Sequence, residues 1–184
     1  MQALIFSIIG GLLAFIPALV ANPGAVITGG YGKVDFGKNF LDGKRIFGDG
    51  KTISGYVGGI AIGTIIGFII LEIMNVAHFA ISGYKFETLI FVSLFLAWGS
   101  LTGDMGGSFI KRRINMKRGQ RGNLLDMWPF VIFAFIFLWL AEPHFFFTLY
   151  GNFIDIVIIL AVTPFLHRGV NILAYKMHRK DVPW

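Results

Sequence analysis

Long apolar runs alternate with polar, glycine-rich stretches along the chain. A helix that crosses the hydrocarbon core of a bilayer needs about 20 mostly apolar residues. Five runs predict such helices, over about residues 3–22, 54–77, 87–102, 127–142 and 152–174. The pattern therefore predicts an all-α integral membrane protein, with residues 1–184 folded as a single transmembrane domain that has five transmembrane helices.

Two polar stretches, residues 23–53 and 103–126, interrupt these runs. With five spans, both stretches and the C-terminal end lie on one side of the membrane, and these regions hold all but one of the 16 Lys and Arg residues. The exception is Lys85. By the positive-inside rule the basic side is the cytoplasm. We therefore expect a multi-pass protein of the cell membrane with two cytoplasmic loops, the N-terminus outside and the C-terminus inside.

The composition agrees with a membrane protein. Hydrophobic residues make up 55% of the chain and charged residues only 14%, where soluble domains average roughly 25% charged residues. The chain has no cysteine, which excludes disulfides and thiolate metal sites. A net charge of +6 would suggest nucleic acid as a partner for a soluble protein. Here membrane topology explains the positions of the charges, so we expect no nucleic-acid partner.

The second predicted helix carries a glycine at every fourth position, Gly55, Gly59, Gly63 and Gly67. Residues four apart share one face of a helix. Small residues on such a face let another membrane helix approach closely. The pattern therefore favours helix packing, and the alternative is that these glycines line a groove for lipid.

The segment "RIFGDGKT" ends like a phosphate-binding P-loop, with Gly50, Lys51 and Thr52 in the last three positions of the motif. The first glycine of the motif would fall at position 45, which is Arg45. No strand precedes the segment, so we do not interpret it as a P-loop. Thr52 and Ser54 are expected to open the second helix, whose N-terminus favours an anion. The segment is therefore predicted to be a phosphate-facing loop built on a membrane helix.

Both polar stretches interleave carboxylates with Lys, Arg and Gly. Basic residues alone would fit simple binding of anionic lipid head groups, whereas carboxylates weaken such an anchor. Mg²⁺ takes carboxylate and phosphate oxygens together, Lys and Arg neutralise further phosphate charge, and glycines let backbone N–H groups approach it. The pattern favours a metal-bound polyphosphate, and the lipid-anchor reading stays open. The carboxylates are Asp35, Asp42, Asp49, Asp104 and Asp126.

Two of these motifs resemble a known family. "GDMGGSFIKRR" followed by "LLD" is similar to the signature of the CDP-alcohol-forming cytidylyltransferases of phospholipid synthesis, and "DFGKNFLDGKRIFGDGKT" resembles the first cytoplasmic loop of the archaeal branch, CDP-archaeol synthase. The resemblance implies a single catalytic transmembrane domain. It implies a Mg²⁺-dependent reaction of CTP with an isoprenoid ether lipid phosphate, 2,3-bis-O-geranylgeranyl-glycerol 1-phosphate, that gives CDP-archaeol and pyrophosphate among membrane lipids.

The resemblance also suggests roles for individual polar residues. Asp104 and Asp126 are the candidate Mg²⁺ ligands, and with Lys111 they form the candidate catalytic set. Ser108 has a helix cap as its structural alternative. The candidate contacts to CTP and its phosphates are Asp35, Lys38, Asn39, Asp42, Lys44, Asp49, Lys51, Thr52, Ser108, Arg112 and Lys117.

Three other functions are alternatives. The same reaction on a diacyl ester lipid differs only in the substrate. A channel or transporter would need polar residues near the bilayer midplane, and here the polar residues gather on one side. A scaffold for anionic lipid would explain the Lys and Arg residues but not the aspartates. Glu72 and Asp155 lie near the outer ends of their predicted helices, where interfacial solvation accounts for them.

Overall fold

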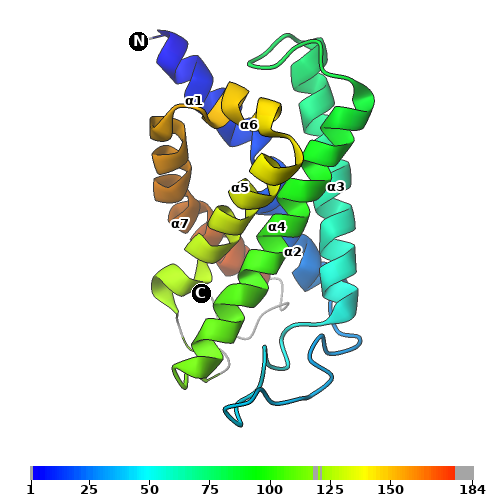
Figure 1. The fold of residues 1–184 in the computed structure, drawn as a ribbon, viewed down its shortest axis with the longest axis vertical. Coiled ribbons are helices and arrows are strands. Elements are labelled where there is room, and N and C mark those ends of the chain that lie inside the picture. The colour runs from blue at the N-terminus through cyan, green and yellow to red at the C-terminus, as the bar shows by residue number, and fades with distance from the viewer. Residues whose placement is uncertain (1, 118–119, 121, 177–184) are drawn as a thin grey trace.

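The computed structural model describes residues 2–117, 120 and 122–176 as a bundle of helices (Figure 1). Only two isolated β-bridges occur in the described part of the chain, both in the first polar stretch. The elements are α1 (Gln2–Ala14), α2 (Ile16–Thr28), α3 (Ile53–Val76), α4 (Phe86–Arg113), the 3₁₀ helix η1 (Asn123–Asp126), α5 (Trp128–Ala141), α6 (Pro143–Tyr150) and α7 (Phe153–Lys176).

Three helical segments of the described chain are long and apolar enough to cross a membrane alone: Ile5–Thr28, Ile53–Val76 and Phe86–Arg113. A fourth is possible if α6 and the Phe153–Gly169 part of α7, bent by 81°, form one broken span. Helix α5 has 14 residues, fewer than the roughly 20 that a full crossing needs. The all-α membrane class is thus confirmed, and the count of five spans stays a prediction.

The first predicted helix is two helices, with a break at Phe15. Pro17 stands in the first turn of α2, where a missing N–H costs no hydrogen bond. Helix α2 then continues through Pro23 to Thr28. The polar stretch expected from residue 23 therefore begins as helix, and the irregular loop is shorter, at residues 29–52.

The predicted third helix was ended too early. Helix α4 runs on to Arg113, so the first part of the expected loop 103–126 is helical. The predicted end of the helix coincides with the end of the apolar run, but a helix that extends past the hydrocarbon keeps its backbone hydrogen bonds among polar residues. The consequence is that Asp104, Ser108, Lys111 and Arg112 stand on one rigid helix.

The four glycines of α3 lie against the backbone of α2. A Cβ atom added at Gly59 would stand 2.7 Å from the carbonyl oxygen of Ala21, and one added at Gly63 would stand 2.8 Å from that of Pro17. Any side chain there would push the helices apart. The packing interpretation of the glycine series is confirmed.

Helix α4 has a second glycine series, which the sequence analysis did not single out. A Cβ atom at Gly99 would stand 2.6 Å from the carbonyl oxygen of Phe133, and one at Gly107 would stand 2.6 Å from that of Leu125. Gly103 between them meets the carbonyl oxygen of Pro129. These contacts press α4 onto η1 and α5.

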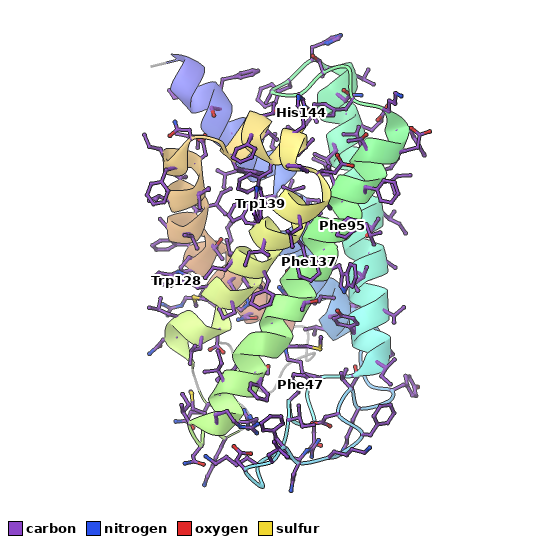
Figure 2. All side chains as sticks on the ribbon, in the orientation of Figure 1. Phe47, Phe95, Trp128, Phe137, Trp139 and His144 are labelled. Carbon is purple, nitrogen blue, oxygen red and sulfur yellow. The ribbon has the colours of Figure 1, made fainter. Side chains whose placement is uncertain are left out.

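The polar segments gather at one end of the bundle. Figure 1 shows the loop 29–52 and the C-terminal end of α4 together at the lower end, while α6 and the α3–α4 connection occupy the upper end. Between the two ends, Figure 2 shows mostly apolar and aromatic side chains, with Phe47 at the lower end and His144 at the upper end. The buried core includes Phe15, Leu96 and Phe130. The loop 29–52 and the C-terminal end of α4 thus lie at the same end of the bundle.

Candidate active site

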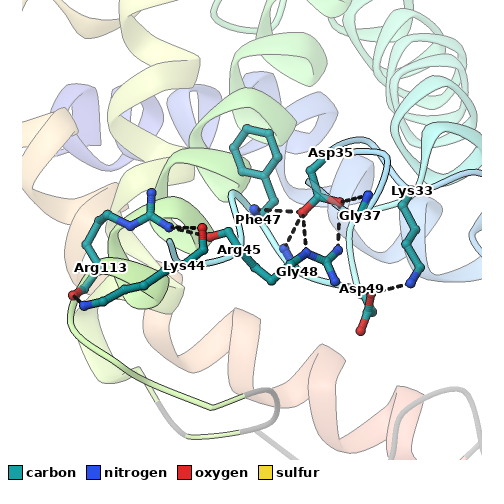
Figure 3. A network of polar contacts seen from close by, with 9 residues as sticks. All are labelled: Lys33, Asp35, Gly37, Lys44, Arg45, Phe47, Gly48, Asp49 and Arg113. Atoms are coloured by element: carbon teal, nitrogen blue, oxygen red, sulfur yellow. Dashed lines mark hydrogen bonds and ion pairs between the residues drawn. The ribbon is translucent and has the colours of Figure 1, made fainter. Parts of the chain in front are cut away.

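Asp35 organises the loop 29–52 from within. It is 4% exposed. Its carboxylate accepts hydrogen bonds from the backbone N–H groups of Gly37 (3.0 Å), Phe47 (3.1 Å) and Gly48 (3.0 Å), and from the Arg45 guanidinium, with Nη2 at 2.8 Å (Figure 3). Gly48 adopts φ +96°, which only glycine enters at little cost, and so turns its N–H toward the carboxylate.

These contacts keep Asp35 ionised. Burial alone would raise its pKa, but the hydrogen bonds from Arg45 and the three backbone N–H groups outweigh burial and hold the pKa well below its usual range. Asp35 was expected to contact substrate. Its oxygens instead bond groups of its own loop, so its structural task here is to shape that loop.

Asp49 completes the same network on the exposed side of the loop. It pairs with Lys33 at 2.6 Å and with Arg45 at 2.9 Å, and these two cations lower its pKa. Neither Arg45 nor Lys33 was among the predicted site residues. Lys38 and Asn39, which are among the predicted contacts to CTP, are exposed after the turn at Asp35, and Asn39 forms an isolated β-bridge with Arg45.

Lys51 and Thr52 stand where the loop enters α3. The Thr52 hydroxyl caps the helix by accepting hydrogen bonds from the N–H groups of Gly55 (3.2 Å) and Gly30 (3.3 Å). The predicted helix start is therefore confirmed. Lys51 reaches across to α4, where its Nζ pairs with Oδ2 of Asp104. This pair joins the end of the first loop to the predicted metal ligand.

Asp126 approaches the same face of α4 from the other side. One carboxylate oxygen pairs with Lys111 Nζ at 2.6 Å, and the other accepts a hydrogen bond from Gly122 N–H at 2.6 Å. Lys111 lies two turns after Asp104 on α4, so both share one face. Asp104 interacts electrostatically with both Lys51 and Lys111. Three segments therefore contribute alternating charges, Lys51, Asp104, Lys111 and Asp126, to one cluster.

Three further predicted residues lie on α4 or just after it. Arg112 passes close to Gly48, where an added Cβ atom would stand 3.9 Å from its Cδ. Its Nε is buried and has no hydrogen-bond partner within the part of the chain that the structure describes. Ser108 is 5% exposed and lies inside α4, five residues before its last residue, so it is no cap. Lys117 is exposed beyond the end of α4.

Asp42 and Lys44 make contacts with Arg113, which the sequence analysis had not proposed for the site. Asp42 Oδ2 pairs with Arg113 Nε at 2.9 Å, and Lys44 Nζ donates to the Arg113 carbonyl oxygen at 2.6 Å. Both were expected to contact nucleotide or phosphate. Here they tie the loop to the end of α4.

The cluster suits a divalent cation that arrives with a polyphosphate. Among the residues described, no group of three or more His, Asp or Glu side chains could hold a metal ion alone. Mg²⁺ is commonly held by one or two carboxylates, with substrate phosphate and water as its other ligands. The donor set of Asp104 and Asp126 fits this mode. The ammonium groups of Lys51 and Lys111 now stand against these carboxylates as counter-ions.

The fold and the cluster together define a class: a membrane-embedded enzyme whose charged site lies at one end of a helical bundle. Within that class, the chain belongs to the CarS-like CDP-archaeol synthase family, whose model matches residues 1–184. The family resemblance drawn from the two polar stretches is therefore confirmed.

Individual relatives cover nearly the whole chain. A CDP-archaeol synthase of Picrophilus torridus is 50% identical over 182 residues, which is 98% of each chain. One of Pyrococcus furiosus is 44% identical over 169 residues, 92% of this chain and 93% of its own. A solved structure, described as an intramembrane enzyme for archaeal membrane lipids biosynthesis, is similar with a TM-score of 0.69 and 32% identity, and the match covers 88% of this chain and 92% of that one.

Proposed function

We propose that this protein transfers CMP from CTP to 2,3-bis-O-geranylgeranyl-glycerol 1-phosphate, which gives CDP-archaeol and pyrophosphate. Membership of the CDP-archaeol synthase family supports the reaction. The observation that carries the proposal is the meeting of two acid–base pairs, Lys51 with Asp104 and Lys111 with Asp126, at one end of the bundle. A lipid anchor needs no such carboxylates.

The reaction requires neutralisation of the negative phosphate charges more than it requires proton transfer. The second pKa of a phosphomonoester is about 6, so the lipid phosphate is largely dianionic at neutral pH. One of its oxygens attacks the α-phosphorus of CTP and forms the new P–O bond. The bond from the α-phosphorus to the oxygen that bridges to the β-phosphorus breaks, and pyrophosphate leaves. The substrates bring on the order of six negative charges together, so positioning and electrostatic stabilisation supply the catalysis.

The chain's own residues divide this task. Asp104 and Asp126 would hold Mg²⁺, which neutralises phosphate charge when bound. Lys51 and Lys111 lie beside these carboxylates and would turn to the phosphate oxygens. Arg112, with its buried Nε, adds a fixed positive charge close to the loop. The N-terminus of α3 after Thr52 favours the remaining phosphate charge.

The membrane placement follows from the same arrangement. We place the loop 29–52 and the end of α4 in the cytoplasm, where CTP is present, with the N-terminus outside. Helix α5 and the bent pair α6–α7 would complete five spans. The isoprenoid chains of the substrate would stay in the bilayer, between helices, while the phosphate reaches the cluster.

The test is direct. Purified protein is incubated with labelled CTP, Mg²⁺ and either the geranylgeranyl ether lipid phosphate or a diacyl ester lipid phosphate, and CDP-lipid is measured. The proposal expects product from the ether lipid that disappears when EDTA removes the metal. Product from the ester lipid alone would support the CDP-diacylglycerol alternative. Absence of product from both lipids would support a non-enzymatic scaffold.

Asp104→Asn tests the metal assignment. The variant should lose activity by at least about 10²–10³-fold, the range found when one group that stabilises the transition state is removed, while the protein still folds, as judged by its elution and by cooperative thermal unfolding. Glu87→Gln is the matched control, because Glu87 lies in the first turn of the same helix, away from the site. Full activity of Asp104→Asn would remove Asp104 from the reaction.

A further inference from the structure

Arg113, the last residue of α4, joins the helix to the loop 29–52. Its guanidinium donates to the carbonyl oxygen of Lys44 at 3.1 Å and to that of Arg45, and its Nε pairs with Asp42 at 2.9 Å. Only 20% of the side chain is exposed. A single cation thus holds three residues of the loop tip, Asp42, Lys44 and Arg45.

Two aromatic rings enclose the same guanidinium. Its Cζ lies 4.5 Å from the ring centroid of Phe109 on α4 and 5.2 Å from that of Phe40 in the loop. The two rings also contact each other edge to face, 5.2 Å apart. Aromatic faces attract a cation at these distances. Arg113 therefore makes both aromatic and ionic contacts, and these contacts join the loop to α4.

Lys44 makes a reciprocal hydrogen bond to the backbone of Arg113. Its Nζ donates to the Arg113 carbonyl oxygen at 2.6 Å. The last carbonyl groups of a helix have no partner inside the helix, and a cation near them is favourable. Arg113 and Lys44 therefore exchange hydrogen bonds, as Figure 3 shows on the left of the view.

We propose that Arg113 is a positioning residue, which keeps the loop 29–52 on α4 so that Lys51 stays beside Asp104. The inference rests on the proposed function. The connection runs along the chain: Arg113 fixes the carbonyl of Arg45, the Arg45 side chain binds Asp35 and Asp49, and Lys51 follows two residues later. A loop released at Arg113 would lose the defined approach of Lys51 to α4.

This role predicts a distinct kinetic effect. Without the Arg113 contacts the loop samples other positions. Because CTP binds only the form in which the loop is docked on α4, the apparent affinity for CTP falls in proportion to the docked fraction. Arg113→Ala should raise KM for CTP by about 10–100-fold, for a docked fraction of about 1–10%. At saturating CTP the loop is docked again, so kcat should stay within a few-fold of wild type.

Limited proteolysis reads the loop position without catalysis. In the absence of CTP, proteinase K should cut Arg113→Ala within residues 36–50 faster than wild type, and CTP with Mg²⁺ should suppress the cleavage. Phe109→Leu should show the same two effects in weaker form, and Arg113→Lys should lie between Arg113→Ala and wild type. Lys85→Ala, which removes a charge at the opposite end of α4, should show neither.

The outcomes separate the two proposals. Wild-type KM and wild-type cleavage in a folded Arg113→Ala protein would overturn the positioning role. A fall in kcat with unchanged KM and unchanged cleavage would also overturn it, and would assign Arg113 a direct contact with the reacting phosphates. If Arg113→Ala fails to fold, Phe109→Leu carries the same test. An inactive wild-type protein would refute the proposed function, while the cleavage pattern would still decide the loop contact.

Discussion

Replacing Lys51 by Met should change the affinities for metal and for nucleotide in opposite directions. In the structure the Lys51 ammonium pairs with Asp104, and the two side chains are 24% and 27% exposed. An effective dielectric constant near 20 suits such a partly exposed site. A divalent ion about 4 Å from the ammonium would then meet a repulsion of about 8 kcal/mol, twice the value for two unit charges. The ammonium must therefore leave Asp104 before Mg²⁺ binds there.

Replacing Lys51 should increase the affinity for a divalent ion by less than this repulsion, because in wild type the ammonium can move into solvent. Breaking an ion pair of intermediate exposure costs about 1–2 kcal/mol, between the values for surface and buried pairs. Without nucleotide, Lys51→Met should therefore bind a divalent ion about 5–30-fold more tightly than wild type. With nucleotide, Lys51 is free to contact phosphate, and a charged hydrogen bond contributes about 1.5–3 kcal/mol. In wild type this gain is offset by the roughly 1–2 kcal/mol needed to break the Lys51–Asp104 pair, so the variant should bind Mg²⁺–CTP about 3-fold more weakly at the middle of these ranges and up to about 30-fold more weakly.

The assay uses Mn²⁺ as a spectroscopic substitute for Mg²⁺. Electron paramagnetic resonance titration gives the metal affinity without nucleotide, and calorimetry gives the affinity for Mg²⁺–CTP. Lys33→Met is the matched control, since it removes the same charge from the same loop but from a partner, Asp49, outside the cluster. It should change neither affinity. Weaker Mn²⁺ binding by Lys51→Met would refute the exchange of the lysine for the metal.

Two predictions concern stability. Asp35→Asn should destabilise the protein by about 1–3 kcal/mol at neutral pH, because the Arg45 charge and buried N–H groups lose their ionised acceptor. Since the pKa of Asp35 is lowered in the folded state, its contribution is complete above the unfolded value of about 3.9. The difference in thermal unfolding between variant and wild type should therefore shrink only as the pH falls below about 4, and a constant difference would contradict the assignment. Gly103→Ala should lower stability in detergent by about 1–3 kcal/mol through its contact with Pro129. Gly106→Ala, whose added Cβ would have 3.9 Å to its nearest neighbour, should be neutral, and equal effects of the two would contradict the packing.

The features that depend on local sequence were predictable. Thr52 as a helix cap and the start of the following helix follow from residue types next to each other in the chain. The glycine series of α3 predicts close packing of a partner helix because its period matches the helix. The end of α4 was not predictable from hydropathy, because polar residues past the membrane surface keep helical hydrogen bonds that an apolar-run criterion does not detect.

The ion pairs between the aspartates and the Lys and Arg residues could not be predicted from the sequence. Asp35, Asp42, Asp49, Asp104 and Asp126 were equivalent as residue types, and each was a candidate for substrate or metal. Which Lys or Arg meets each carboxylate depends on how the loop lies on α4, which is a tertiary property. A signal for Arg113 was present nonetheless: the spacing of Phe109 and Arg113 puts an aromatic ring and a cation on one helix face.

The two glycine series explain why charged groups from distant segments can meet at all. Close packing of α3 on α2 and of α4 on α5 leaves little freedom between the helices, so the last residues of each have defined positions. Gly107 brings α4 against Leu125, and the next residue is Asp126, which pairs with Lys111 one turn further along α4. The carboxylates Asp104 and Asp126 are thus set by the rigid bundle, while Lys51 arrives on a loop that Arg113 holds. A site divided in this way keeps its two carboxylates fixed on the bundle and places the cation that pairs with Asp104 on a loop.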